Sequence, residues 1–214
     1  MSEAMSGYYP VFLRIKGRRC VVVGGGEVAQ RKVEALAEAG ARVRVIAPSL
    51  TPRLAEMAAA GAVEAESRPY APGDLKGVFL TVAATDDAET NALVAREARR
   101  RRVLLNVVDQ PRECSFIVPS VVRRGELVLA ISTGGLSPAL ARKVREEVEA
   151  QFGPEYALLA RVVGRVRRRV RRTGVSPDAW SQALDGELLE LLRRGEVARA
   201  EQRLEEALMV GVAR

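Results

Sequence analysis

The sequence of 214 residues contains no histidine, which removes the side chain that most often carries protons near neutral pH and binds metals. Its two cysteines, Cys20 and Cys114, are too few for a disulfide framework and lack the spacing of a metal site. Any acid–base chemistry therefore falls to Asp, Glu, Lys, Tyr, Cys or the substrate itself. We expect a reducing, cytoplasmic environment and no resident metal.

Long apolar runs are also missing. No stretch approaches the roughly 18 apolar residues that suggest a membrane span. The start, MSEAMSGYYPVFLRIKGRR, has no apolar run ending in a small-residue cleavage site. We therefore expect no membrane association and no secretory signal.

Positive charge is abundant. The formal net charge is +7, and most of the positive charge is arginine, which favours bidentate pairing with carboxylates and phosphates. Within the arginine-rich residues 160–174, Val162, Val166 and Val170 form one apolar stripe at helical spacing. We interpret the arginines there as a solvated helix face, with capture of substrate carboxylates as the second interpretation. Nucleic acid is not an expected partner, because aromatic residues are few.

Apolar runs alternate with helical patterns from Arg19 to Pro111. Such alternation predicts a Rossmann-like parallel sheet with helices on both faces. The expected strands are 20–23, 43–46, 62–66, 78–84 and 103–108, and the expected helices are 28–40, 50–61 and 86–102.

The pattern changes after Pro111. Strand-like residues 115–122 and 127–133 flank an RRGE turn, and a helix is expected from Ser137-Pro138 to about Phe152. Only helices are expected from Pro154 on, with breaks near 173–174 and 185–186. The predicted domains are a Rossmann-like domain (1–112), a β-hairpin-plus-helix segment (113–150) and a helical domain (151–214).

The stretch CVVVGGGEVAQRK holds the most specific signal. Gly24-x-Gly26-x-x-Ala29 fits the dinucleotide-binding fingerprint, with a valine strand before it and a helical pattern after it. That fingerprint needs one glycine for the turn and one so that a pyrophosphate can approach the backbone at a helix N-terminus. We predict that Gly24, Gly25 and Gly26 bind a dinucleotide; the alternative is a purely structural turn.

One feature departs from a usual NAD site. An acidic residue normally ends the second strand and binds the ribose hydroxyls, but here the sequence is Ile46-Ala47-Pro48-Ser49. Either Ser49 and backbone groups hold the ribose, or the cofactor is different. Arg42 and Arg44 could suggest NADP, but such strand arginines are commonplace. We predict NAD.

Five motifs occur in order and resemble the precorrin-2 dehydrogenase family, which also forms the N-terminal module of siroheme synthase. They are GGGEVAQRKVEALAEAGARVRVIAPS, AATDD, NVVDQP, SFIVPS and STGGLSPALAR. The resemblance covers residues 9–152 strongly. It implies oxidation of precorrin-2 to sirohydrochlorin with NAD, in some members insertion of ferrous iron, and a homodimer built by the segment after the Rossmann domain.

The resemblance also implies site residues. Glu27, Val28, Pro48 and Ser49 match positions whose backbone meets NAD, although Val28 would also suit core packing. Thr85 would lie beside the cofactor cleft; the alternative is that Thr85 or an adjacent Asp caps a helix.

Asp109, in NVVDQP, matches the essential aspartate of the family. A carboxylate there could take a proton while hydride leaves. The alternative is a turn-forming residue before Gln110-Pro111.

A competing function is an NAD-sensing regulatory module of an ion-uptake system. Such modules also begin with a glycine turn, but they usually keep the acidic ribose residue that this chain lacks, and they would not need NVVDQP followed by SFIVPS.

Overall fold

The structure is a computed structural model that describes residues 7–210. Residues 1–6, where the first predicted domain begins and where no secretory signal is expected, lie outside this range. So do residues 211–214, the end of the last predicted domain. The chain forms two compact units, Met1–Val118 and Pro119–Arg214. Across the described residues, no helix is long and apolar enough to cross a membrane.

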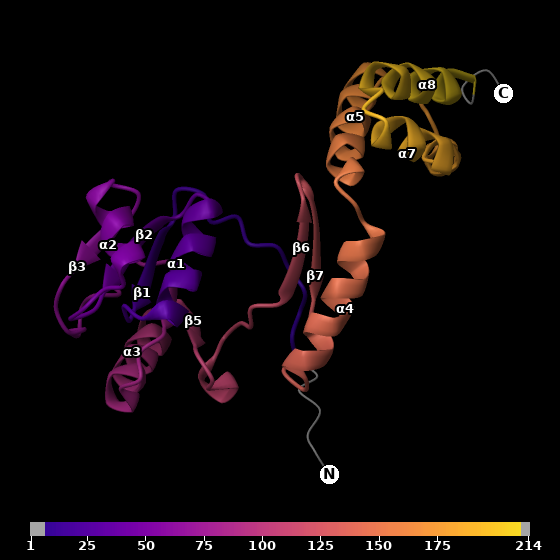
Figure 1. Cartoon of the computed structure of the whole chain (residues 1–214). Helices are drawn as coiled ribbons and strands as arrows, with labels where there is room; N and C mark the ends of the chain where they lie inside the picture. Colours follow the sequence, from indigo (N-terminus) through magenta and orange to yellow (C-terminus); the bar gives the residue numbers. More distant parts are fainter. Residues whose placement is uncertain (1–6, 211–214) are drawn as a thin grey trace, which may run out of the picture. The chain divides into compact units, whose positions relative to one another are not determined.

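The first unit contains a parallel five-stranded sheet in the order β3-β2-β1-β4-β5 (Figure 1). This confirms the predicted Rossmann-like fold. Successive strands are added on one side of β1 up to β3 and on its other side from β4 on. In such sheets, ligands bind at the carboxyl ends of the two strands where the order switches, which here are β1 and β4. The strands are β1 (Arg19–Val23), β2 (Arg42–Ile46), β3 (Glu64–Glu66), β4 (Leu80–Ala83) and β5 (Leu104–Val107).

Helices cover both faces of this sheet (Figure 1). The valine-rich β1 is buried on both sides, because Cys20 and Val22 pack toward α1 (Glu27–Glu38) and α2 (Pro52–Ala59), whereas Val21 and Val23 pack toward α3 (Ala88–Arg101). Continuous apolar strands of this kind are typical of parallel sheets covered on both faces. The packing fixes the carboxyl edge of the sheet, where the loops that follow β1, β2, β4 and β5 lie.

The second unit begins with a hairpin of β6 (Ser120–Arg124) and β7 (Leu127–Ile131). The predicted four-residue RRGE turn is wrong in length: Arg124 pairs with Leu127, which leaves a two-residue turn with Gly125 at φ +60°. After the hairpin, Ser137 caps α4 (Pro138–Gln151) by accepting a hydrogen bond from the Leu140 N–H at 3.2 Å, as predicted.

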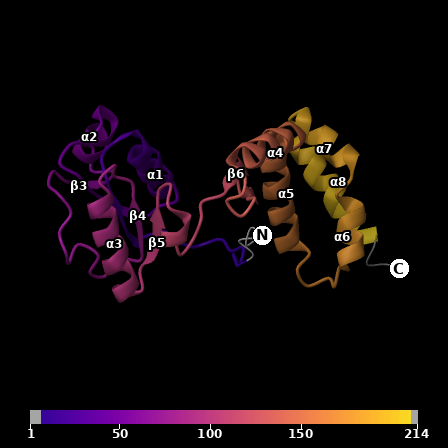
Figure 2. The ribbon, with the colours of Figure 1, turned by 90° about the horizontal axis from the view of Figure 1, so that it is seen from below.

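Helices make up the rest of this unit (Figure 2). The predicted valine stripe is confirmed, because Val162, Val166 and Val170 all lie in its core. Arg165 and Arg169 instead form ion pairs with Glu201, at 2.5 and 2.8 Å. Both predicted helix breaks occur, and a further one at Gly195 was not predicted. The helices are α5 (Glu155–Arg169), α6 (Pro177–Ala183), α7 (Gly186–Arg193) and α8 (Val197–Val210).

Candidate functional site

Two of the three glycines after β1 are required by packing. Gly24 is buried with φ +125°, and a Cβ there would overlap the carbonyl oxygen of Ala84. A Cβ on Gly25 would overlap the carbonyl oxygen of Ser49. The turn is therefore pressed between the loops that follow β4 and β2.

Gly26 has a different role. Its backbone is extended, it is exposed, and an added Cβ would meet nothing within 4 Å. It is the N-cap of α1, no described side chain caps this helix, and the first helical bond runs from the Gln30 N–H to the Gly26 oxygen. The N–H groups of the first turn therefore face open space with the positive end of the helix dipole behind them, which is the arrangement that binds a phosphate.

The loop after β2 forms the next wall of this space. Pro48 and Ser49 are exposed, and the Thr51 N–H donates to the Gly25 oxygen at 2.9 Å. The Thr51 hydroxyl donates to Gln30 Oε1 at 2.8 Å and links this loop to α1. The structure thus places Pro48 and Ser49 next to the glycine turn, although they are distant in sequence.

The arginines of β2 are not available for a ribose phosphate. Arg44 donates to Glu66 at 2.9 Å and to the backbone oxygen of Asp74 at 2.5 Å. Arg42 lies at the start of β2, at the opposite end of the strand from the crevice. Arg53, in the first turn of α2, is paired with two glutamates. Neither arginine of β2 is therefore placed to receive the 2′-phosphate of NADP.

Thr85 lies in the loop between β4 and α3. Its hydroxyl accepts a hydrogen bond from the Asp87 N–H at 3.1 Å, while Asp87 itself is the N-cap of α3. Hydrogen bonds from the Thr90 hydroxyl and the Glu89 N–H hold the pKa of Asp87 below its ordinary value. The capping role considered for Thr85 therefore belongs to Asp87, and Thr85 faces the carboxyl edge next to β1.

Asp109 follows β5 in an exposed turn closed by a hydrogen bond from the Gln110 N–H to the Val107 oxygen at 3.2 Å. Its φ is +58°, a left-handed conformation that Asp tolerates better than most residues. Backbone conformations of this kind concentrate at functional sites. The structure thus shows Asp109 as the turn-forming residue, and its role in catalysis stays a prediction.

Lys32 on α1 is a charged neighbour that the sequence reasoning missed. Burial lowers the pKa of its half-buried ammonium and the charge of Arg31 lowers it further, whereas the negative charge of Asp109 acts to raise it. The ammonium therefore lies within electrostatic range of Asp109. Only the tertiary structure brings them together, because 77 positions separate them in the chain.

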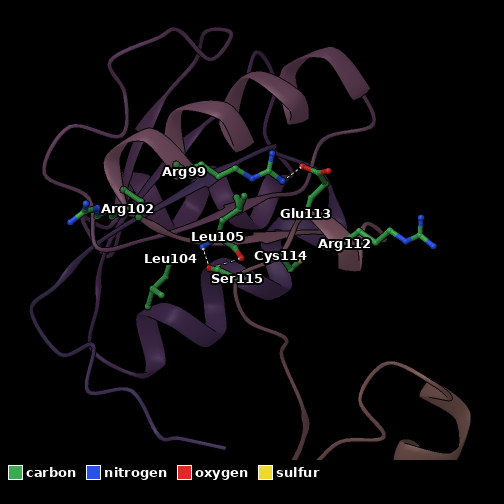
Figure 3. Close-up of a pocket in the computed structure, with 10 residues that line it drawn as sticks. Arg99, Arg102, Leu104, Leu105, Arg112, Glu113, Cys114 and Ser115 are labelled. Carbon is green, nitrogen blue, oxygen red and sulfur yellow. Dashed lines mark hydrogen bonds and ion pairs between the residues drawn. The ribbon is translucent and has the colours of Figure 1, made fainter. Parts of the chain in front are cut away.

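The strand predicted from residue 115 begins only at Ser120, and Cys114 and Ser115 instead lie along the free edge of β5 (Figure 3). The Ser115 hydroxyl accepts from the Leu105 N–H at 2.7 Å, and Cys114 Sγ accepts from the Val107 N–H at 3.1 Å. Burial raises the pKa of the Cys114 thiol, which keeps it protonated. The Ser115 N–H also donates to the Leu105 oxygen at 2.8 Å. Together these contacts replace a neighbouring strand, which protects the edge from pairing with another chain. The adjacent pocket of about 320 Å³ is therefore built around structural contacts, including the Arg99–Glu113 ion pair at 2.5 Å.

The structure gathers most of the predicted residues at one edge of the sheet. Gly24–Gly26, Glu27, Val28, Ser49 and Thr85 surround the end of β1, and Asp109 lies at the end of β5, two strands away. Among the described residues, no group of three or more His, Cys, Asp or Glu could hold a metal ion.

Comparisons with known proteins agree with this arrangement. The family model described as putative NAD(P)-binding matches residues 11–120, and the one described as sirohaem biosynthesis protein central matches residues 124–151. Siroheme synthase 1 of Serratia proteamaculans is 42% identical over 94% of this chain and 43% of its own length. Siroheme synthase of Azotobacter vinelandii is 43% identical over 96% of this chain and 45% of its own length. The chain thus spans less than half the length of these relatives.

A solved structure described as SirC, precorrin-2 dehydrogenase, superposes with a TM-score of 0.74 at 27% identity, covering 92% of this chain and 100% of that one. The order of strands, hairpin and helices is therefore shared along nearly the whole chain. The chain belongs to the precorrin-2 dehydrogenase family, with the putative NAD(P)-binding domain of that family over residues 11–120.

Proposed function

We propose that the chain oxidises precorrin-2 to sirohydrochlorin with NAD. The observation that carries this proposal is the uncapped N-terminus of α1 at Gly26, which opens onto free space at the carboxyl end of β1. The geometry suits a dinucleotide pyrophosphate, and the similarity to SirC indicates the reaction.

In this proposal the chain's own residues bind, orient and move a proton. Gly24–Gly26 and the backbone of Glu27 and Val28 hold the pyrophosphate, while the loop at Pro48 and Ser49 holds the ribose. Thr85 lines the cleft. When bound there, NAD would supply the hydride acceptor for oxidation of the macrocycle, so that NADH and one proton would be released.

Asp109 is the group to which we assign that proton. It is the predicted carboxylate at the carboxyl edge, it is exposed, and the sequence has no histidine to replace it. Lys32 supplies a positive charge on the neighbouring α1.

NAD is preferred to NADP in this proposal. Arg44 is engaged by Glu66 and by the Asp74 backbone, and Arg42 lies at the wrong end of β2. The 2′-phosphate would therefore lack a free guanidinium from β2, while the missing acidic residue leaves the ribose to Ser49 and backbone groups.

The segment over residues 113–150 would join two copies into a homodimer. All five residues of β7, LVLAI, are apolar and none is buried. Val121 on β6 is 37% exposed and Leu140 on α4 is 53% exposed. A two-stranded hairpin with this much exposed apolar surface is marginal alone, and a second copy could cover it.

Ferrous iron would be a second substrate if the chain also makes siroheme. Asp109 is again the carboxylate that we assign to this step. Adding ferrous iron to purified sirohydrochlorin and the protein would test it through the siroheme absorption spectrum.

The main reaction is tested by supplying precorrin-2 with NAD, with NADP and with no cofactor. We expect sirohydrochlorin to form with NAD, more slowly with NADP, and at background rate without either. A clear preference for NADP would contradict the cofactor assignment, and equal rates in all three would contradict the function.

A further inference from the structure

Asn91 is a buried amide in the body of α3. Its side chain is only 6% exposed, its Nδ2 donates to the backbone oxygen of Thr85 at 2.8 Å, and its Oδ1 has no hydrogen-bond partner among the described residues. Buried polar atoms are nearly always paired, and Asn is a weaker helix former than Ala or Leu. Neither helix stability nor complete pairing therefore explains an amide at this position.

The Nδ2 contact holds a particular segment, residues 84–87, which we term the 84–87 loop. The Ala84 N–H donates to the Val23 oxygen at 2.8 Å, and this fixes the start of the loop on β1. At its end, Asp87 caps α3. Between these two points the Asn91 amide fixes the Thr85 carbonyl, so the loop is held from the strand side and from the helix side.

The 84–87 loop packs directly on the glycine turn. The backbone of Gly24 approaches the Ala84 carbonyl so closely that no Cβ would fit between them. A shift of this loop would therefore move the turn, or remove the wall against which the turn is pressed. The open space in front of Gly26 therefore depends on the position of the 84–87 loop and on that of the glycine turn.

We propose that Asn91 is a positioning residue of the cofactor site. By holding the Thr85 carbonyl it keeps the 84–87 loop against Gly24, and it thereby sets the affinity for the dinucleotide without touching it. The inference rests on the proposed binding of NAD.

Two variants test this role. Asn91→Leu keeps the branching and the number of side-chain heavy atoms but removes the donor. Asn91→Ala removes the donor with the best helix-forming residue, so that at least one variant should fold. Thr81→Val is the matched control. Thr81 is fully buried, and its hydroxyl donates to the Val21 oxygen at 3.1 Å. The Thr81→Val variant therefore also loses one buried hydrogen bond, here between β4 and β1.

The measurements are the NAD dissociation constant by calorimetry, KM for NAD and for precorrin-2, and a thermal melt. We expect both Asn91 variants to weaken NAD binding about tenfold, as for one lost hydrogen bond. They should raise KM for NAD and leave KM for precorrin-2 near the parental value. Thr81→Val should lower Tm but leave NAD affinity unchanged.

Parental NAD affinity in both Asn91 variants would overturn the inference while leaving the proposed function intact. So would an affinity loss equal to that of Thr81→Val, because it would reflect general destabilisation. If the parent protein itself does not bind NAD, the proposed function fails, and this inference fails with it.

Discussion

The three consecutive glycines perform two different functions at the level of single residues. Gly24 and Gly25 let the loops after β4 and β2 close on the turn, whereas Gly26 keeps the N-terminus of α1 open. Their substitution should therefore have opposite consequences for folding and binding.

Gly26→Val should abolish NAD binding and leave the protein folded. The extended backbone of Gly26 suits valine, but its side chain would occupy the place of the pyrophosphate. Gly25→Ala is the control, and it should lower Tm because its Cβ would collide with the Ser49 carbonyl. Calorimetry and a thermal melt of both variants measure this, and NAD bound to Gly26→Val as tightly as to the parent would place the cofactor elsewhere.

Asp109→Asn should slow oxidation of precorrin-2 roughly 10²–10⁴-fold, the usual effect of losing a positioned proton acceptor. Asn is chosen because it tolerates the φ of +58°, whereas alanine would add backbone strain. Asp109→Gly, which also accepts this φ, is the second variant. Steady-state turnover, an NAD titration and a melt decide the result: NAD affinity and Tm should hardly change. Near-parental turnover in both variants would show that Asp109 is only a turn residue.

A fingerprint marks the three glycines in the sequence and a motif marks Asp109, and the structure places all four at the carboxyl edge of the sheet. The neighbourhood of Asp109 could not be predicted from the sequence. Lys32 is unremarkable in a helical pattern, and nothing in the sequence marks Asn91 as one of the buried polar residues of its helix. Both residues matter through contacts with loops that are distant in the sequence or that only the tertiary structure positions.

At the level of elements, a buried polar cluster ties the segment before β4 to α3. Glu97 is 5% exposed and accepts hydrogen bonds from the Tyr70 hydroxyl at 2.6 Å and the Gly73 N–H at 2.8 Å, and it pairs with Arg101. Burial acts to raise the pKa of Glu97, but these partners outweigh it and hold the pKa below its ordinary value. Burial and the bond to Glu97 raise the pKa of Tyr70.

This cluster should make stability depend on pH. A carboxylate with a depressed folded-state pKa contributes stability above its unfolded pKa of about 4.3, and that contribution is lost as the pH falls through the lower folded value. Tyr70, with a raised pKa, contributes below about pH 10 and loses its contribution at higher pH.

Glu97→Gln should therefore flatten the acid limb of the stability curve and lower the free energy of unfolding by about 1–3 kcal/mol at pH 7. Urea unfolding between pH 3 and pH 7 measures this, with Glu113→Gln, at a more exposed ion pair, as the control. If Glu97→Gln and the parent lost stability equally as the pH falls, ionisation of Glu97 would not contribute to the acid dependence of stability.

Elements were predicted best where periodicity and end signals agreed. The strands of the parallel sheet and the Ser137-Pro138 helix start are such cases. Residues 115–119 were expected to be part of a strand. Apolar β-forming residues give the same sequence pattern whether they form a hairpin strand or an irregular segment along the edge of a sheet. Ser115 bonds to Leu105 of β5 through both its backbone N–H and its hydroxyl. Periodicity carries no information about such contacts.

For the whole molecule, the proposed homodimer predicts that Val121→Arg and Leu140→Arg convert the protein to a monomer. Each would place a charge on the apolar surface of the hairpin segment, where burial of an unpaired charge is costly. Leu184→Arg is the matched control, since Leu184 is similarly exposed (40%) but lies in the helical region. Sedimentation at micromolar concentration measures the state, and a monomeric parent would refute the proposal.

The central claim is that NAD-dependent oxidation of precorrin-2 takes place on this chain. The most direct measurement follows NADH and sirohydrochlorin together when the purified protein receives precorrin-2 and NAD. We predict that one NADH forms for each sirohydrochlorin, at a rate proportional to protein concentration, and that Gly26→Val reduces both products to background. NAD binding without formation of either product would contradict the claim and would favour an NAD-sensing module on the same fold.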